Sequence, residues 1–417
     1  MTVQDRYDDV ERWTASGCRS LTGPAESSGL GPPDGLVAAL DVVARRISVA
    51  SRAIGQPVVI DPLAEVAMRF HLAGLSRNGR TSCGGATRML DSADGTVVLA
   101  LPRDDDLELV PALVGSEVPA GRDAAWVAIA EWMAGRASEQ IVERAVLLGL
   151  AAAVVGPTPA GASAADGVQV ASLDRSCDRS LRRVGSRPPR VVDLGSLWAG
   201  PLCAQLLGLA GCEVIKVETV YRPDGVRSGP PAVHARLNAG KRSVAIDPRT
   251  TEGRRIVGGL LDAADVVIEA SRPRALAAWG LGPERSSRPQ VWVSITGHGY
   301  TGDGATRIGF GDDVAAAAGL VATGSGTAWF CADAIADPLT GMVAAAEALE
   351  ALADGRAVHL DVSMVSVARQ FAGRTVDVTR IATEATTVTS GVSFPSMQGV
   401  TASLGADTDD VVRAWLG

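Results

Sequence analysis

The sequence predicts an α/β protein in which a domain built on a parallel sheet is joined to a smaller α+β module. Three observations carry this prediction. Residues 190–219 form a strand, a small-residue turn, an apolar helix and a second strand. Strands and helices then alternate as far as residue 372. The strands are short apolar runs, which is typical of a parallel sheet covered by helices on both faces.

The first strand–turn–helix unit begins with the apolar residues of 191–194 and turns at Gly195–Pro201. Ala199 and Gly200 allow a ligand to approach the backbone, and Pro201 suits the first turn of a helix. Such a unit opens many nucleotide-binding domains, but it is also an ordinary βαβ unit, and this stretch alone favours the ordinary one.

The later elements follow from apolar periodicity and from helix start signals. We expect strand 243–246, helix 251–264, strand 265–269, helix 275–279, strand 291–296, helix 312–320, helix 338–353, strand 359–364, helix 365–371 and a terminal helix 407–416.

Residues 1–156 are expected to form the smaller module. Helical spacing covers 36–54 and 62–75, and Asp94-Gly95 joins two β-rich runs, 86–90 and 96–101, into a hairpin. Two helices follow at 124–135 and 138–149. The acidic run 104–106 is interpreted as a solvated helix start, in preference to a metal site.

The composition of residues 157–189, rich in Pro, Ala, Ser, Gly and Arg, indicates a linker. The predicted organisation is therefore module 1–156, linker 157–189, large domain 190–372 and tail 373–417, with the tail returning to the large domain.

Composition excludes several classes of function. The net charge of −8 argues against nucleic-acid binding. Six scattered cysteines and four histidines form neither CxxC nor HExxH, so no metal site is expected. The longest apolar run, 145–156, is too short to span a membrane, and the first residues lack a secretory apolar segment, so a cytoplasmic location is expected.

Gly297-His298-Gly299-Tyr300-Thr301-Gly302 satisfies the GxGxxG pattern after a predicted strand. Residues 303–307 do not predict an amphipathic helix, so no helix N-terminus would face a pyrophosphate. We interpret the segment as a flexible glycine loop that can move over a bound ligand.

Several segments together resemble the class III CoA-transferase family, which also contains the α-methylacyl-CoA racemases. They occur in family order and are VVDLGSLWAGPLCAQLLGLAGCEVIKVE (191–218), PDGVRSGPP (223–231), LNAGKRSVAIDP (237–248), ADVVIEASRPRALAAWGLGPE (264–284), VSITGHGYTG (293–302), ADPLTGMVAAAEALEAL (336–352) and HLDVSM (359–364).

The resemblance implies a Rossmann-like large domain, a small domain and a homodimer of interlocked chains. It also implies an acyl-CoA donor, a carboxylic acid acceptor and a catalytic aspartate, which is Asp337 here. A carboxylate can attack a thioester without a metal or a permanently bound cofactor, and coenzyme A enters as a substrate thioester. The alternative interpretation of Asp337 is a helix N-cap before Pro338.

By the same resemblance, the turn Leu197–Ala199, with Trp198 at its centre, would line the CoA site. Arg227, Lys241 and Arg242 match family cations. The alternative at 241–242 is a solvated basic pair or a partner for Asp247. The loop glycines Gly297, Gly299 and Gly302 would shield the acyl intermediate from water.

Three departures from the family pattern keep alternatives open. Ala270-Ser271 replaces a common Asn-Phe pair at a cofactor contact, and Gly311-Asp312-Asp313 lacks the histidine of the racemases. The module at 79–149 faintly resembles the family's small domain but precedes the large domain, which suggests a rearranged chain. The leading prediction is an acyl-CoA:carboxylate CoA-transferase. The alternatives are an α-methylacyl-CoA racemase and a CoA-binding paralogue without transferase activity.

Overall fold

The structure is a computed structural model of the 417-residue chain. It describes residues 3–157, 171–173, 187–271, 273–283, 288–324, 326–375, 394 and 399–417. Most of the predicted linker 157–189, and residues 376–393 and 395–398 of the predicted tail 373–417, lie outside the described residues.

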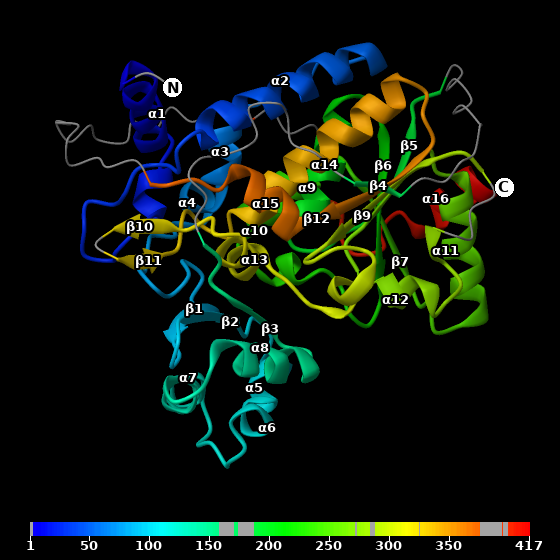
Figure 1. The fold of residues 1–417 in the computed structure, drawn as a ribbon. Coiled ribbons are helices and arrows are strands. Elements are labelled where there is room, and N and C mark those ends of the chain that lie inside the picture. The colour runs from blue at the N-terminus through cyan, green and yellow to red at the C-terminus, as the bar shows by residue number, and fades with distance from the viewer. Residues whose placement is uncertain are drawn as a thin grey trace.

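A seven-stranded sheet organises the large domain (Figure 1). Its order is β4-β12-β9-β8-β5-β6-β7, and all neighbours are parallel except β4 and β12. The strands are β4 (Ala171–Leu173), β5 (Arg190–Leu194), β6 (Glu213–Thr219), β7 (Arg242–Ile246), β8 (Val266–Glu269), β9 (Val291–Thr296) and β12 (Val358–Ser363).

Numbered along the chain, the six parallel strands lie in the order 3-2-1-4-5-6, which is the doubly wound Rossmann arrangement. The predicted parallel sheet is thus confirmed. In this arrangement ligands bind beyond the carboxyl ends of the strands, where the order reverses. Here that point lies between β5 and β8, so the turn after β5 occupies the expected place.

Helices cover both faces of this sheet because its strands are apolar on both sides. Val191 belongs to the core under α9 (Ala199–Leu209) and α14 (Ala336–Ala353), whereas Val192 belongs to the core under α11 (Thr251–Ala263) and α16 (Thr408–Leu416). The other large-domain elements are η3 (Gly225–Ser228), α10 (Pro231–Asn238), α12 (Pro273–Ala277), η5 (Gly302–Thr306), α13 (Gly311–Ala317), β10 (Ala322–Gly324), β11 (Thr327–Trp329) and α15 (Met364–Phe371).

The first helices of the chain pack on the large domain. They are α1 (Val3–Ala15), η1 (Cys18–Leu21), α2 (Leu36–Ile54), α3 (Pro62–Val66) and α4 (Met68–Ala73). Helix α2 lies beside α14, and its apolar face joins the same core as the sheet (Figure 1). The helix expected at 62–75 is divided at Ala67 into α3 and α4.

Residues 87–154 form a small lobe with a core of its own. The predicted hairpin is confirmed, because β1 (Thr87–Asp91) pairs with β2 (Thr96–Ala100) antiparallel, and β3 (Ala151–Val154) completes the sheet. Its helices are α5 (Asp104–Glu108), α6 (Val110–Val114), α7 (Arg122–Ala134) and α8 (Ser138–Leu147). The acidic run does begin a helix, α5, but it is not fully solvated, because Asp106 is buried and pairs with Arg103.

The second face of the small sheet packs against α13 and the β10–β11 hairpin, through Met89, Val98 and Ala153. The small lobe therefore lies next to the segment that leads into α14 (Figure 1). The predicted domain boundaries stay a prediction, as does the dimer. Within the described residues, no helix has the length and apolarity needed to cross a bilayer.

Candidate active site

Asp337 lies in the first turn of α14 and is partly buried. The N-cap of that helix is Ile335, so Asp337 is the second helical residue and not the N-cap that its position before Pro338 also suggested. Its carboxylate accepts a hydrogen bond from the backbone N–H of Gly311, at the start of α13. The helix N-terminus and this N–H both favour the ionised form of the side chain.

Backbone strain concentrates around this aspartate. Among the described residues, three that are not glycine have a left-handed φ: Leu197 at 66°, Ala332 at 55° and Ala334 at 43°. Two of them immediately precede Asp337, and the third lies in the turn after β5. Because such conformations are unfavourable for residues with a Cβ, their gathering at two adjacent segments is typical of a functional site.

The glycine loop reaches Asp337 through a chain of close backbone contacts. A Cβ on Gly297 would lie 2.8 Å from the nitrogen of Gly309, and a Cβ on Gly311 would lie 2.3 Å from Oδ2 of Asp337. Gly299 and Gly302 have left-handed φ values of 114° and 67°. Glycine thus lets the segment 308–311 fit between the loop and the carboxylate.

The turn after β5 also lies beside Asp337. Gly341, one helical turn after Asp337, packs so closely on this turn that a Cβ there would be 2.8 Å from the carbonyl oxygen of Ala199. Trp198 is buried, whereas Leu197 is 45% exposed. The structure therefore brings together the predicted turn, the glycine loop and Asp337.

Three further carboxylates surround Asp337. Asp312 accepts a hydrogen bond from the nitrogen of Ala334 (2.9 Å), Asp313 accepts one from Phe310 (2.7 Å), and Asp333 is buried. Burial raises the pKa of Asp337 to about 7, and the neighbouring Asp333 raises it further, while Arg69 opposes the shift. Burial likewise raises the pKa of Asp313 to about 7 and, with help from Asp333, that of Asp312 to about 8.

The three predicted cations pair with carboxylates other than Asp337 and its acidic neighbours. Lys241 is buried, and its ammonium donates to Asp193 Oδ2 (2.8 Å), the carbonyl of Pro201 (2.8 Å) and Asn238 Oδ1 (3.1 Å). Burial lowers its pKa to about 8. From the protein interior, Lys241 thus links the end of β5, just before the turn, to the first turn of α9.

Arg227 donates to Glu218, with 2.5 Å between its Nη2 and Oε2, beside the turn. Arg242 lies 3.6 Å from Glu213, and both are the first residues of their strands, β7 and β6. This pair therefore occupies the amino edge of the sheet, opposite the edge at which α/β domains bind ligands.

Sequence reasoning missed the charges buried beneath and beside the site. Lys216 donates to the carbonyl of Gly195 (2.8 Å) and pairs with Asp224 (2.9 Å), which in turn accepts from the nitrogen of Leu197 (2.9 Å). A lysine inside the otherwise apolar strand β6 is a signal that can be found in the sequence, because buried lysines need partners. Arg69 and Asp333 carry no such local signal.

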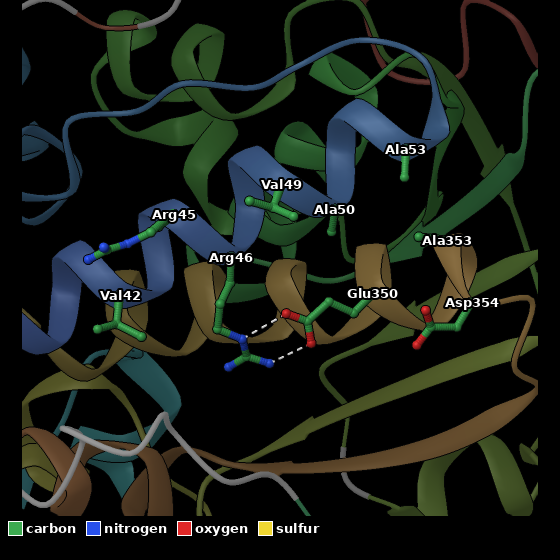
Figure 2. A pocket seen from close by; sticks show the side chains of 9 residues that line it. All are labelled: Val42, Arg45, Arg46, Val49, Ala50, Ala53, Glu350, Ala353 and Asp354. Atoms are coloured by element: carbon green, nitrogen blue, oxygen red, sulfur yellow. Dashed lines mark hydrogen bonds and ion pairs between the residues drawn. The ribbon is translucent and has the colours of Figure 1, made fainter.

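A groove of about 540 Å³ lies between α2 and α14 on the outer surface (Figure 2). Arg46 crosses it to pair with Glu350. Glu350 is 13 residues along α14 from Asp337, or about 20 Å at the rise of an α-helix. The groove is therefore separate from the carboxylate cluster.

No set of three or more His, Cys, Asp or Glu side chains in the described ranges has an arrangement that could hold a metal ion. The residues present can instead supply a partly shielded carboxylate nucleophile. Its raised pKa leaves a large fraction ionised at neutral pH.

Comparison with protein families matches residues 189–401, just over half of the chain, to CoA-transferase family III. The succinate–glutarate CoA-transferase of Agrobacterium fabrum is 36% identical over 209 residues, 43% of this chain and 52% of that protein. The succinyl-CoA–D-citramalate CoA-transferase of Chloroflexus aurantiacus is 39% identical over 141 residues, 30% of this chain and 35% of that protein.

A solved structure of a CAIB/BAIF family protein from Brucella suis is 31% identical, with a TM-score of 0.41, over 46% of this chain and 55% of that chain. The chain spans about half, or less, of the length of these relatives. The match nevertheless runs through all the strands from β5 to β12 and includes Asp337. The chain belongs to CoA-transferase family III.

Proposed function

We propose that this protein is an acyl-CoA:carboxylate CoA-transferase in which Asp337 is the nucleophile. One observation carries the proposal. Asp337 is the carboxylate on which the strained segment 332–334, Gly311 and the turn after β5 converge. The family membership and the names of the relatives agree with CoA transfer.

The reaction proceeds by two exchanges. The Asp337 carboxylate attacks the thioester carbonyl of the donor, which forms a mixed anhydride and releases CoA thiolate. The thiolate attacks the aspartyl carbonyl of the anhydride, which leaves an aspartyl-CoA thioester and releases the donor acid as a carboxylate. The acceptor carboxylate then attacks this thioester, and the returning thiolate attacks the acyl carbonyl to give the new acyl-CoA and free Asp337.

Each neighbouring element has a task in this scheme. The turn Leu197–Ala199 contacts CoA, while Lys241 holds that turn in place from the interior. The glycine loop closes over the anhydride and the thioester, which water would otherwise hydrolyse. Arg227, beside the turn, contributes positive charge at the same edge, and Arg242 belongs to the support of the sheet.

The remaining parts of the proposal concern assembly and location. We propose a homodimer in the cytoplasm, with the small lobe acting as the family's small domain. Light scattering on the purified chain tests the dimer, and a monomer mass at all concentrations would contradict it.

Trapping of the intermediate tests the chemistry. The protein is incubated with succinyl-CoA, quenched with hydroxylamine and digested, and mass spectrometry locates the hydroxamate. We expect it on Asp337 and expect none in Asp337→Asn. Asp354→Asn, which changes an exposed aspartate just after the same helix, is the matched control and keeps the label. Full transfer activity in Asp337→Asn would refute the proposal.

A racemase is the second candidate, because Asp312 lies in the cluster with Asp337 at the place where racemases carry a histidine. Two acid–base groups on opposite faces of an α-carbon would exchange its hydrogen with solvent. We expect no deuterium at the α-carbon of a 2-methylacyl-CoA after incubation in D₂O. Exchange without any label on Asp337 would favour the racemase, and binding of acyl-CoA with neither event would favour a non-catalytic paralogue.

A further inference from the structure

Asp333 is an unusual buried residue. It is 1% exposed, and within the described residues neither of its carboxylate oxygens accepts a hydrogen bond. Its one ion pair within the described residues joins its Oδ2 to Nη1 of Arg69, at 3.2 Å. A buried carboxylate without hydrogen bonds depends on such a cation to stay ionised, because desolvation favours the neutral form.

Arg69 comes from α4, which lies outside the part of the chain that matches the family. Its side chain is 31% exposed, and its guanidinium carbon lies 5.7 Å from the centre of the Trp198 ring. Arg69 thus bridges the N-terminal helices, the turn after β5 and the entry to α14. An arginine held on one side by an aromatic face and on the other by a carboxylate has a restricted position.

The position of Arg69 matters because several ionisable side chains lie close to Asp337. Asp312 and Asp313 face it from α13, Asp333 precedes it, and Cys83 lies near Asp333 and Asp312. Arg307, which lies near His298, opposes the increase in the pKa of Asp313 that burial causes. Burial raises the pKa of Asp337, Asp333 and Asp312, and Arg69, which contacts both Asp333 and the Trp198 ring beside this cluster, opposes that shift in all three.

We propose that the Arg69–Asp333 ion pair sets the charge state of the nucleophile: Arg69 keeps Asp337 anionic, and Asp333 fixes Arg69 in place while weakening its effect. The inference rests on the proposed role of Asp337. Arg69 is a positioning residue in this scheme, supplied by a helix outside the family match. Within the pair, Arg69 favours the ionised form of Asp337, whereas Asp333 disfavours it.

The two members of the pair should therefore shift the titration of Asp337 in opposite directions. Arg69→Gln removes the favourable cation, so the midpoint for ionisation of Asp337 rises by about one pH unit. Asp333→Asn removes a repelling carboxylate, while the Trp198 ring still holds Arg69 beside the cluster, so the midpoint falls by about one pH unit. A merely structural role of the pair would not produce shifts of opposite sign.

Carbodiimide labelling measures this titration without any substrate. The reagent activates protonated carboxyl groups, and mass spectrometry gives the rate of amide formation at Asp337 as a function of pH. Arg69→Lys, which keeps the charge, should restore most of the wild-type midpoint. Arg46→Gln is the matched control, because it breaks an arginine–carboxylate pair on the far part of α14 and should leave the midpoint unchanged.

Thermal unfolding of each variant shows whether it is folded. If Arg69→Gln does not fold, Asp333→Asn and Arg69→Lys carry the test. Midpoints that stay at the wild-type value, or that move in the same direction in Arg69→Gln and Asp333→Asn, would overturn the inference. The trapping experiment separates the two proposals, because a missing hydroxamate on wild-type Asp337 refutes the nucleophile, whereas unmoved midpoints refute only the ion pair.

Discussion

Gly311→Ala tests how tightly the fold holds the carboxylate of Asp337. The added Cβ would lie 2.3 Å from Oδ2 of Asp337 and 2.4 Å from the carbonyl oxygen of Ala334. Both distances are about 1 Å short of ordinary contact between carbon and oxygen. One neighbour is backbone at the start of α14 and the other is the proposed nucleophile, so neither can move without disturbing the site.

Two effects follow, with different magnitudes. Overpacking at the junction of α13 and α14 should reduce the free energy of unfolding by about 1–3 kcal/mol. Displacing the Asp337 carboxylate by about 1 Å should slow formation of the aspartyl thioester about 100-fold. The loss of activity is therefore expected to exceed what the fraction of unfolded protein explains.

The assay combines urea unfolding with the rate of hydroxamate formation on Asp337. Gly135→Ala is the matched control, because Gly135 has a φ of −103° and no atom within 4 Å of an added Cβ. It should change neither quantity by more than a small fraction. Unchanged trapping in Gly311→Ala, at unchanged stability, would refute the described contact between Gly311 and Asp337.

Three further predictions concern buried charges. Because the proposed nucleophile Asp337 must be ionised to attack, the trapping rate should rise with pH through about 7 and fall about tenfold per pH unit well below it. A trapping rate independent of pH between about 5 and 8 would contradict this. Lys216→Met leaves the buried Asp224 without its cation and should lower the free energy of unfolding in urea by about 3–5 kcal/mol. A decrease below about 1 kcal/mol would contradict the buried ion pair. Arg236→Leu leaves the buried Glu65 without its cation and should lower the free energy of unfolding by a similar amount, about 3–5 kcal/mol, which is what a broken buried pair costs. Adding Glu65→Leu should restore most of that loss. If it restores none, Arg236 must stabilise the fold through partners other than Glu65.

Much of the fold follows from local patterns. Strand β9 and helix α2 begin and end where apolar spacing predicts, and the hairpin lies across Asp94-Gly95. These features depend on residues close together in the sequence, so they are readable from it. The short strand β4, inside the segment predicted as a linker, has no such pattern and arises from pairing with the distant β12.

Side-chain environments were harder to predict. The family resemblance predicts Lys241 at the CoA site, but the residue is interior, because Asp193, Pro201 and Asn238 all accept hydrogen bonds from its ammonium. Arg242, its neighbour, points its charge to Glu213 at the amino edge of the sheet. Two adjacent cations in a motif can therefore have different surroundings, because successive residues entering a strand face opposite sides.

The sequence by itself determined the parallel α/β domain, the family resemblance and Asp337 as the candidate nucleophile. Only the tertiary structure decided what surrounds that aspartate. Arg69 comes from a helix more than 250 residues earlier, and Asp312 approaches Asp337 from α13, whereas Asp333 belongs to the segment just before Asp337. The ionisation of a carboxylate depends on burial and on charges close in space, and neither quantity is written in the order of residues along the chain.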